Sequence, residues 1–388
     1  MIPGIKEEQL LLLDCLENPN DVKFPQDFDL HKFAYWLDRH RLRPQLSLFL
    51  ERNENVPKEL RDYLLKFRHL HFYKNLHIIG EWVRIHREFK NKGVDILPYK
   101  GPFLSQKLFE NPGIRECYDL DVLVKKRDLK DVQSLLKHLG YVCRGSKEFI
   151  DRNELFLEAE SEIDYFHPEK KLSIDLHWRT NQPSFAFAFD SDCYFEKAPE
   201  IEMQGHRFKA FDENLEFVLL CVHGARSRWT NLCHLIDIKM ILEKEYLNWH
   251  EVMSYADQFR VNKVIAQTLI LAKRFGKYNL PDFVEQKLKK YYNDKLIQFM
   301  YKVWFASDEV RHVKKYSMIT PLERFLYYMN CRESLNDKMR CIKYTYFWPS
   351  LDDIQLLRLP KKLLFVYYLF KPCRLLLFRP IKSIFVKK

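Results

Sequence analysis

Glycine is scarce in this sequence, and the spacing of the few glycines excludes two common kinds of site. The ten glycines stand at positions 4, 80, 93, 101, 113, 140, 145, 205, 224 and 276. No two are two residues apart and no two are four apart, so neither a G-x-G-x-x-G dinucleotide turn nor a G-x-S-x-G nucleophile turn is present. The segment 140–147 approaches an NTPase phosphate loop, but its serine and lysine are in the wrong order. It is more typical of a helix end followed by a loop.

Paired cysteines and long apolar runs are also absent. The nine cysteines are scattered and include no C-x-x-C pair, which is typical of free thiols in a reducing compartment and argues against structural zinc. No run approaches the ~20 apolar residues of a membrane span, and the N-terminal run is too short for a signal-peptide core. We therefore expect a cytoplasmic protein, with two or three subdomains in its 388 residues.

Acidic residues are missing from the C-terminal tail. Residues 358–388 contain nine lysines and arginines and no aspartate or glutamate, whereas the whole chain carries a net charge of +11. The rest of the chain is close to neutral, which disfavours nucleic acid as a partner, because a nucleic-acid groove needs cations throughout its domain. Two interpretations of the tail stay open. Its apolar runs pack on the protein body, or the tail binds peripherally to the inner face of an anionic membrane.

Apolar periodicity divides the chain into four regions. Residues 1–92 have helical spacing, with Pro57 at the start of a long helix. Residues 93–210 form an α/β core in which VDILPYKG, CYDLDVLV, EIDYFH and LSIDLHW are strands, with one more strand at about 201–208. Residues 211–336 are helical, and residues 337–388 form a basic, apolar, proline-interrupted tail. The expected fold class is α+β, a small mixed β-sheet with helical regions before and after it.

Three carboxylates are the strongest candidates for chemistry. Asp119 and Asp121 alternate along YDLDVLV and therefore project from one face of a strand. Two such carboxylates repel each other unless a cation joins them, and Mg²⁺ or Mn²⁺ takes oxygen ligands. Asp175 in SIDLHW is placed to be the third carboxylate, and Asp164 on the partner strand is its competitor. The alternative is a pair of exposed aspartates on an edge strand.

A phosphate site is predicted about twenty residues before this strand. Lys100 and Gly101 lead into the N-terminus of a helix, where free backbone N–H groups and the helix dipole favour an anion. Lys100 adds a positive charge, and Arg115 can add a guanidinium group that binds two oxygens. Carboxylates for a metal that face a phosphate site are the components of phosphoryl or nucleotidyl transfer.

At these residues the chain resembles the nucleotidyltransferase superfamily related to DNA polymerase β, and most closely its uncharacterised bacterial branch. The matching motifs are Lys100-Gly101, Arg115, Asp119-Leu120-Asp121, Leu123-Val124, Gly140-Tyr141, Asp175-Leu176-His177-Trp178, His223-Gly224, Trp229 and Asp237. The resemblance covers roughly residues 30–285. One departure concerns the first turn, where the superfamily holds the triphosphate with a Gly-Ser pair. Here Pro102 follows Gly101, so one N–H donor is lost.

The resemblance implies a metal-dependent enzyme that moves a nucleoside monophosphate from a nucleoside triphosphate to an acceptor hydroxyl. It implies Mg²⁺ or Mn²⁺ at Asp119, Asp121 and Asp175, with Asp175 also activating the acceptor. That acceptor is a small molecule, a surface-polymer precursor or a protein, and the sequence does not choose among them. Further candidates for substrate binding are His177, His223, Arg226 and Asp237. The alternative function is a non-catalytic nucleotide-binding or scaffold protein that keeps the fold.

Overall fold

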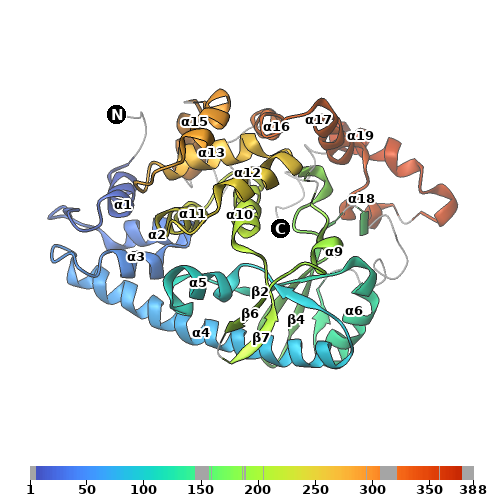
Figure 1. Cartoon of the computed structure of the whole chain (residues 1–388), viewed down its shortest axis with the longest axis horizontal. Coiled ribbons are helices and arrows are strands. Elements are labelled where there is room, and N and C mark those ends of the chain that lie inside the picture. The colour runs from blue at the N-terminus through green and yellow to red at the C-terminus, as the bar shows by residue number, and fades with distance from the viewer. Residues whose placement is uncertain are drawn as a thin grey trace.

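A computed structural model describes residues 6–377 except 145–156, 159, 186, 188, 204, 294, 306–320 and 358. It confirms the α+β class, because a small mixed sheet lies beside one long helix and further helices cover the other side of the molecule (Figure 1). The strands and α4 lie at the bottom of this view, and the later helices lie along its top. Of the predicted basic tail, residues 358 and 378–388 lie outside the described residues.

In the described N-terminal part, the helices that precede the sheet are α1 (Glu7–Glu17), α2 (Leu30–His40), α3 (Arg43–Phe49) and α4 (Lys58–Asn91). The predicted helix start at Pro57 is confirmed, since α4 begins directly after it and proline suits that position. The Asp29 side chain caps α2 by accepting a hydrogen bond from the backbone of its first turn. The helix ends at Arg41, which takes the left-handed conformation, and its apolar side chains Phe33 and Leu37 are fully buried.

The larger sheet has the strand order β1-β2-β5-β4-β3. Its strands are β1 (Ile96–Pro98), β2 (Asp119–Val124), β3 (Val142–Cys143), β4 (Glu162–His167) and β5 (Leu172–His177). β2 and β5 run parallel, whereas the other neighbouring strands are antiparallel. The connections hold α5 (Gly101–Phe109) and η1 (Pro112–Ile114) before β2, and η2 (Lys126–Asp128) and α6 (Leu129–His138) after it. All four strands expected for the start of the core are therefore confirmed.

The two faces of this sheet differ in polarity because side chains alternate along each strand. One face is apolar and packs against α4 and α6 in a buried core that includes Trp82, Phe89, Leu120, Val122, Val132, Leu136, Ile163, Ile174 and Leu176. The other face carries polar residues at matching register positions, among them Asp121 of β2, Asp175 of β5 and Asp164 of β4. The packed face thus fixes the positions of the strands, and the polar face is left available for a functional site.

A short hairpin replaces the single strand predicted at about 201–208. β6 (Glu200–Met203) and β7 (His206–Lys209) are antiparallel partners in a separate two-stranded sheet. Gly205 in the connection has a φ of +77°, a conformation that glycine adopts without strain. The prediction of one continuous strand was wrong because this tight turn reverses the chain within the segment.

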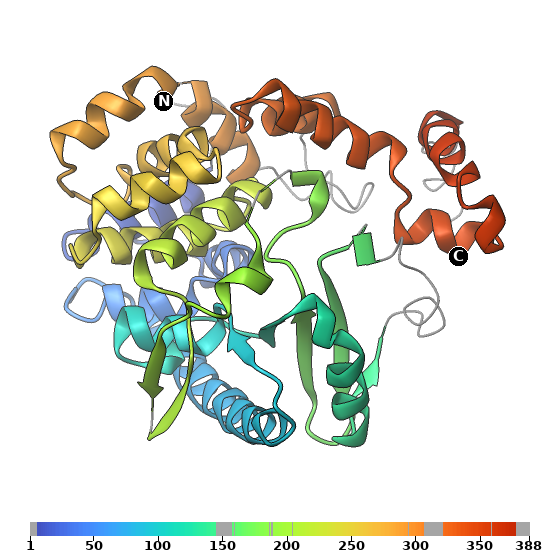
Figure 2. The same ribbon diagram turned by 45° about the vertical axis from the view of Figure 1, so that its right-hand side comes forward.

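Helices dominate the described part of the chain after β5, and they share a second apolar core with the N-terminal helices. They are η3 (Pro183–Phe185), α9 (Ser191–Tyr194), α10 (Glu213–Arg226), α11 (Cys233–Glu243), α12 (Trp249–Gln258), α13 (Asn262–Ala272), α14 (Asp282–Leu288), η4 (Lys289–Tyr291), α15 (Lys295–Phe305), α16 (Pro321–Asn330), α17 (Leu335–Ile342), η6 (Lys343–Phe347), α18 (Leu351–Leu356), η7 (Lys361–Leu363) and α19 (Val366–Leu377). Figure 2 shows the last of these at one end of the molecule. None of the helices in the described ranges is both long and apolar enough to cross a membrane.

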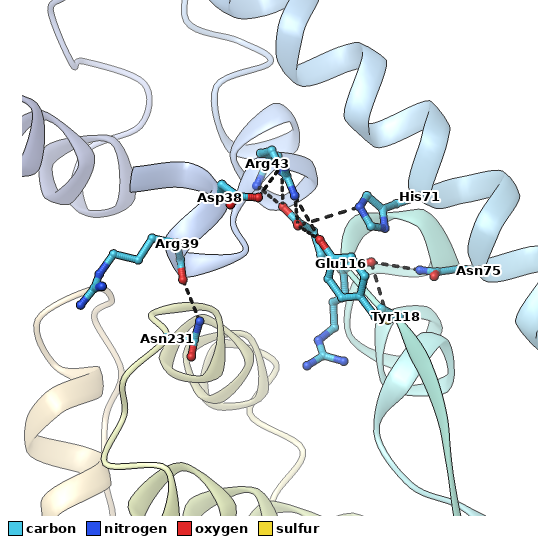
Figure 3. A network of polar contacts seen from close by, with 10 residues as sticks. Asp38, Arg39, Arg43, His71, Asn75, Glu116, Tyr118 and Asn231 are labelled. Atoms are coloured by element: carbon cyan, nitrogen blue, oxygen red, sulfur yellow. Dashed lines mark hydrogen bonds and ion pairs between the residues drawn. The ribbon is translucent and has the colours of Figure 1, made fainter. Parts of the chain in front are cut away.

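A polar network fixes the loop that leads into β2 on the N-terminal helices (Figure 3). Arg43 of α3 donates two hydrogen bonds to the buried carboxylate of Glu116, at 2.8 and 2.5 Å. The Tyr118 hydroxyl donates to the same carboxylate at 2.8 Å. Asn75 of α4 donates to the carbonyl of Arg115 at 3.0 Å. These contacts hold the backbone on both sides of Glu116, so the first residues of β2 have a defined position.

Candidate active site

Two carboxylates and a histidine converge where β2 and β5 run side by side. Asp121 and Asp175 are register partners on these parallel strands, so their side chains leave the same face of the sheet. His177 lies two residues further along β5 and shares that face. One ligand atom from each of the three residues lies within 4.8 Å of the others, a group that could hold a metal ion. Carboxylate oxygens are the ligands that Mg²⁺ and Mn²⁺ prefer.

Asp119 lies beside this group rather than within it. It is the first residue of β2 and pairs in register with Ser173 of β5. In the part of the chain that the structure describes, the candidate metal-binding group does not include it. Burial raises the pKa of Asp119, and the charge of Asp121 raises it further, so the two carboxylates interact electrostatically. Of the three predicted carboxylates, the structure brings Asp121 and Asp175 together with His177 and leaves Asp119 adjacent.

The two register partners have pKa values on opposite sides of the ordinary aspartate value. For Asp121, burial opposes ionisation, but the charge of Lys100 and a hydrogen bond from His177 outweigh burial and lower the pKa to about 2. For Asp175, burial and the charges of Asp119 and Asp121 raise the pKa to about 7. The site thus contains one carboxylate that stays ionised and one that exchanges a proton near neutral pH.

His177 connects the site to a carboxylate that the sequence analysis missed. Its Nε2 lies 2.9 Å from Oδ1 of Asp121, and its Nδ1 lies 3.2 Å from Oε2 of Glu162 on β4. Glu162 and His177 are register partners. The alternation in EIDYFH places Glu162 on the same strand face as Asp164, and this is the signal that could have identified it. The hydrogen bond at Nε2 orients the His177 ring toward Asp121, whereas Nδ1 makes no hydrogen bond to any described residue and lies at ion-pair distance from Glu162.

Lys100 reaches the carboxylates from the turn between β1 and α5. Its backbone has a φ of +63° and that of Gly101 a φ of +56°, two left-handed residues in succession. This turn aims the Lys100 ammonium at the site, with Nζ 3.8 Å from Oδ1 of Asp121 and 4.2 Å from the centre of the Tyr99 ring. Burial lowers the pKa of Lys100, and Asp121 opposes this effect. The predicted phosphate site and the predicted metal site are therefore adjacent.

Arg115, predicted to bind phosphate, and Asp237, a candidate for substrate binding, bind each other. The guanidinium of Arg115 donates from Nε and Nη2 to the two carboxylate oxygens of Asp237, each at 2.8 Å. A third hydrogen bond, from Nη1 to the carbonyl of Gly101, measures 3.1 Å. Both side chains are almost fully buried. This arrangement attaches α11 to the Lys100–Gly101 turn, and direct binding of phosphate by Arg115 stays a prediction.

Residues of α10 and α11 lie near Lys100 and add basic groups to this region. The rings of His223 and His234 meet edge to face with centroids 5.0 Å apart. Burial lowers the pKa of His223 well below its usual value, and the charges of Lys100 and of Arg226 contribute. Among the described residues, His223 Nδ1 and the Tyr99 hydroxyl are buried without a hydrogen-bond partner. Unpaired buried polar atoms beside cations are features expected where an anionic ligand binds.

Asp164, the competitor for the third carboxylate, lies in the same row of the sheet. It pairs in register with Asp175, and one of its oxygens lies 3.5 Å from Nη1 of Arg144. It is absent from the metal-binding group found among the described residues. The geometry favours Asp175 as the partner of Asp121 at the metal site. Asp175 is the register partner of Asp121, whereas Asp164 lies one strand further away.

The parallel pair of β2 and β5, its carboxylates and the adjacent lysine turn define a protein of the nucleotidyltransferase class. The comparison with protein families is more specific. The family described as uncharacterised nucleotidyltransferase matches residues 26–277. Because this match covers more than half of the chain and all of the site residues described above, the chain belongs to that family. The family match indicates a transferase whose acceptor is unspecified. It also confirms the resemblance found in the sequence.

The search of curated proteins finds no match to this chain.

Proposed function

We propose that this protein is a metal-dependent nucleotidyltransferase that transfers a nucleoside monophosphate from a nucleoside triphosphate to an acceptor hydroxyl. The observation that carries the proposal is the group Asp121, Asp175 and His177 with the Lys100 ammonium beside it. Carboxylates next to a cationic phosphate site are what phosphoryl chemistry requires, because it depends on positioning and on charge neutralisation.

The residues present fit a hard divalent cation. Asp121, Asp175 and Asp119 offer carboxylate oxygens, and burial together with the charges of Asp119 and Asp121 raises the pKa of Asp175, a strain that a cation would relieve. Asp121 and Asp175 would hold Mg²⁺ or Mn²⁺, with Asp119 completing the set. When bound, such an ion neutralises phosphate charge and polarises the reacting phosphoryl group. His177 keeps Asp121 in place through its hydrogen bond.

Asp175 is the residue that we assign to proton transfer. Asp175 is the register partner of Asp121, so its carboxylate lies at the proposed metal site, where an ionised carboxylate can accept the proton of an acceptor hydroxyl. As that proton moves to Asp175, the hydroxyl oxygen forms a bond to the α-phosphorus. The bond from the α-phosphorus to the bridging oxygen breaks, and pyrophosphate leaves with that oxygen.

Side chains rather than backbone N–H groups are assigned to the leaving phosphates. Pro102 removes a donor from the first turn of α5, where the superfamily uses a Gly-Ser pair. Lys100, Arg226 and His223 supply basic groups nearby, and their mutual electrostatic effects indicate that they share one region. Within the described residues, the Arg226 guanidinium makes no hydrogen bond or ion pair, so it is available to a ligand.

Purified enzyme should be incubated with each labelled nucleoside triphosphate, a cell extract and Mg²⁺ or Mn²⁺, and the labelled product identified. Asp121→Asn should abolish transfer and metal binding, and because Lys100 and His177 stabilise the Asp121 charge, its folding should be checked by circular dichroism. Asp175→Asn should lower kcat more than nucleotide affinity, since its role lies in the chemical step. The matched control is Asp164→Asn, which removes a carboxylate from the same row and should retain turnover. Arg226→Met should raise the KM for the triphosphate about tenfold with a smaller effect on kcat.

A non-catalytic nucleotide-binding protein is the competing function, and the same variants separate it from the proposal. Such a protein would bind a triphosphate in thermal-shift titrations but would give no labelled product with any extract. Near-normal turnover of Asp121→Asn would contradict the assignment of the metal site. A defect of Asp164→Asn together with near-normal turnover of Asp175→Asn would exchange the roles of these two residues.

A further inference from the structure

Helix α19 directs both of its charged residues inward, whereas Leu369 on the helix and Phe365 just before it are exposed apolar residues. Leu369 is 69% exposed, and Phe365, one helical turn earlier, is exposed as well. Lys371 is only 7% exposed, and its ammonium donates to the backbone carbonyls of Tyr344 and Trp348 at 3.2 and 2.5 Å. In a helix that packs on a protein body and faces water, the polarity would be the reverse.

Arg374 on the same helix is also directed inward. It forms an ion pair with the buried carboxylate of Asp353 and a hydrogen bond to the Ser350 hydroxyl at 3.4 Å. The charged residues of α19 are therefore used to attach the helix to the segment 344–353. They are not used to make its outer face soluble in water.

Helix α17 also combines an exposed apolar pair with a buried ionised residue, although its Arg340 is exposed. Leu335 is 75% exposed, and Met339, one turn later, is exposed too. Asp337 between them is 3% exposed and accepts two hydrogen bonds from Arg260, at 2.8 and 2.9 Å. The pair that faces outward is apolar, and the ionised residue between its members lies inside.

Exposed apolar side chains are concentrated in this end of the chain. Of the seventeen large apolar residues that are exposed in the described ranges, nine lie between 322 and 369, including Leu322 and Leu326 one turn apart on α16. α16 packs on α17, and both α17 and α19 pack on η6. Figure 2 shows these elements following one another at one end of the molecule. A concentration of exposed apolar side chains in neighbouring helices is a feature of binding surfaces.

The charge of the C-terminal sequence indicates which kind of partner covers this apolar surface. Residues 358–388 contain nine lysines and arginines and no acidic residue, and seven of these cations remain when Lys371 and Arg374, which point inward, are set aside. A second copy of the chain would bring two such basic segments together, which is unfavourable. An anionic bilayer attracts the cations and accepts leucine and phenylalanine side chains at its interface.

We propose that helices α16, α17 and α19 bind the surface of an anionic bilayer through their outward apolar side chains, and that the excess of cations in the C-terminal sequence favours this anionic partner. Attachment at the interface agrees with the lack of any membrane-crossing helix in the described ranges. The surface extends beyond residues 358–388, for which the sequence predicted membrane contact, because α16 and α17 lie before residue 358. This proposal of membrane binding does not depend on the transferase chemistry.

The test is flotation of the full-length protein with phosphatidylcholine vesicles that contain about one third phosphatidylglycerol, against pure phosphatidylcholine. Wild-type protein should float with the anionic vesicles only, and high salt should weaken the binding. The double variants Phe365→Ser/Leu369→Ser and Leu335→Ser/Met339→Ser should each reduce partitioning about tenfold. The matched control is Leu70→Ser/Tyr73→Ser, which removes an exposed apolar pair from α4 and should float like wild type.

Three results would overturn the proposal: equal flotation of the double variants and the control, equal binding to both vesicle types, or no binding by wild type. Sedimentation of the same proteins detects a second copy as the occupant. Self-association that the double variants abolish, without vesicle binding, would assign the surface to a dimer instead. Should a double variant fail to fold, the lipid and salt dependence of the wild-type protein still decides the question.

Discussion

Asp121 and Asp175 lie opposite each other on the parallel strands β2 and β5, yet their pKa values are about 2 and about 7. The difference arises from their neighbours. Asp121 has the ammonium of Lys100 at 3.8 Å and the ring of His177 at 2.9 Å, whereas Asp175 is buried beside the charges of Asp119 and Asp121. Two residues of the same type thus suit different roles, one as a permanent anion and one as a proton acceptor.

The contribution of Asp175 to the stability of the metal-free protein should fall as the pH rises from about 4 to 7, and it is measured as the difference between wild type and Asp175→Asn. An aspartate in an unfolded chain has a pKa of about 3.9, whereas Asp175 in the folded protein has a pKa of about 7. Between these two pH values Asp175 is protonated in the folded protein and ionised in the unfolded chain. Raising the pH therefore favours the unfolded chain, and the free energy of unfolding decreases. The slope attributable to Asp175 is at most about 1.4 kcal/mol per pH unit, and urea unfolding at several pH values measures it.

Asp175→Asn should remove this part of the slope, whereas Asp164→Asn, on the neighbouring strand, should keep it. Mn²⁺ or Mg²⁺ competes with the same proton, so the ion should raise the melting temperature more at pH 8 than at pH 6. Equal slopes for wild type and Asp175→Asn would show that this carboxyl group does not titrate in the expected range.

The buried pair of Arg115 and Asp237 should be essential for stability as a pair. Arg115→Met leaves the Asp237 carboxylate buried without its partner, and such a loss costs about 3–5 kcal/mol of unfolding free energy. The double variant Arg115→Met/Asp237→Leu removes both charges and should be less destabilised than the sum of the single variants. Urea unfolding of the four proteins measures this coupling. Additive single effects, together with a loss of triphosphate affinity in Arg115→Met, would support the predicted phosphate contact instead.

Gly224 should tolerate no side chain. A Cβ atom there would lie 2.2 Å from the ring of Trp229, which is completely buried and has a φ of +52°. Gly224→Ala should destabilise the protein by about 1–3 kcal/mol, as overpacking of a core does. The control is Gly80→Ala in the interior of α4, where a Cβ would meet nothing within 4 Å and alanine should add about 0.5–1 kcal/mol. Thermal unfolding of both variants should therefore show shifts of opposite sign.

Several features of the fold could be predicted from local patterns. The start of α4 at Pro57, the strand alternation that places Asp119 and Asp121 on one face, and the turn at Lys100 depend on neighbouring residues and were confirmed. The hairpin at 201–208 was missed, because a tight turn within a short alternating segment leaves little pattern to detect. Glu162 was missed since its role depends on the register between β4 and β5, and register is set by the packed sheet.

The sequence by itself determined the family, the α+β class and the residues available for the site, because motif order and alternation are local properties of the chain. Only the tertiary structure decided how those residues are combined. It paired Arg115 with Asp237, 122 residues apart, placed Gly224 against Trp229 and turned the cations of α19 inward. Such contacts join segments that are distant in the sequence. The partner of a buried charge depends on which helices pack together, and the local spacing of residues does not specify that packing.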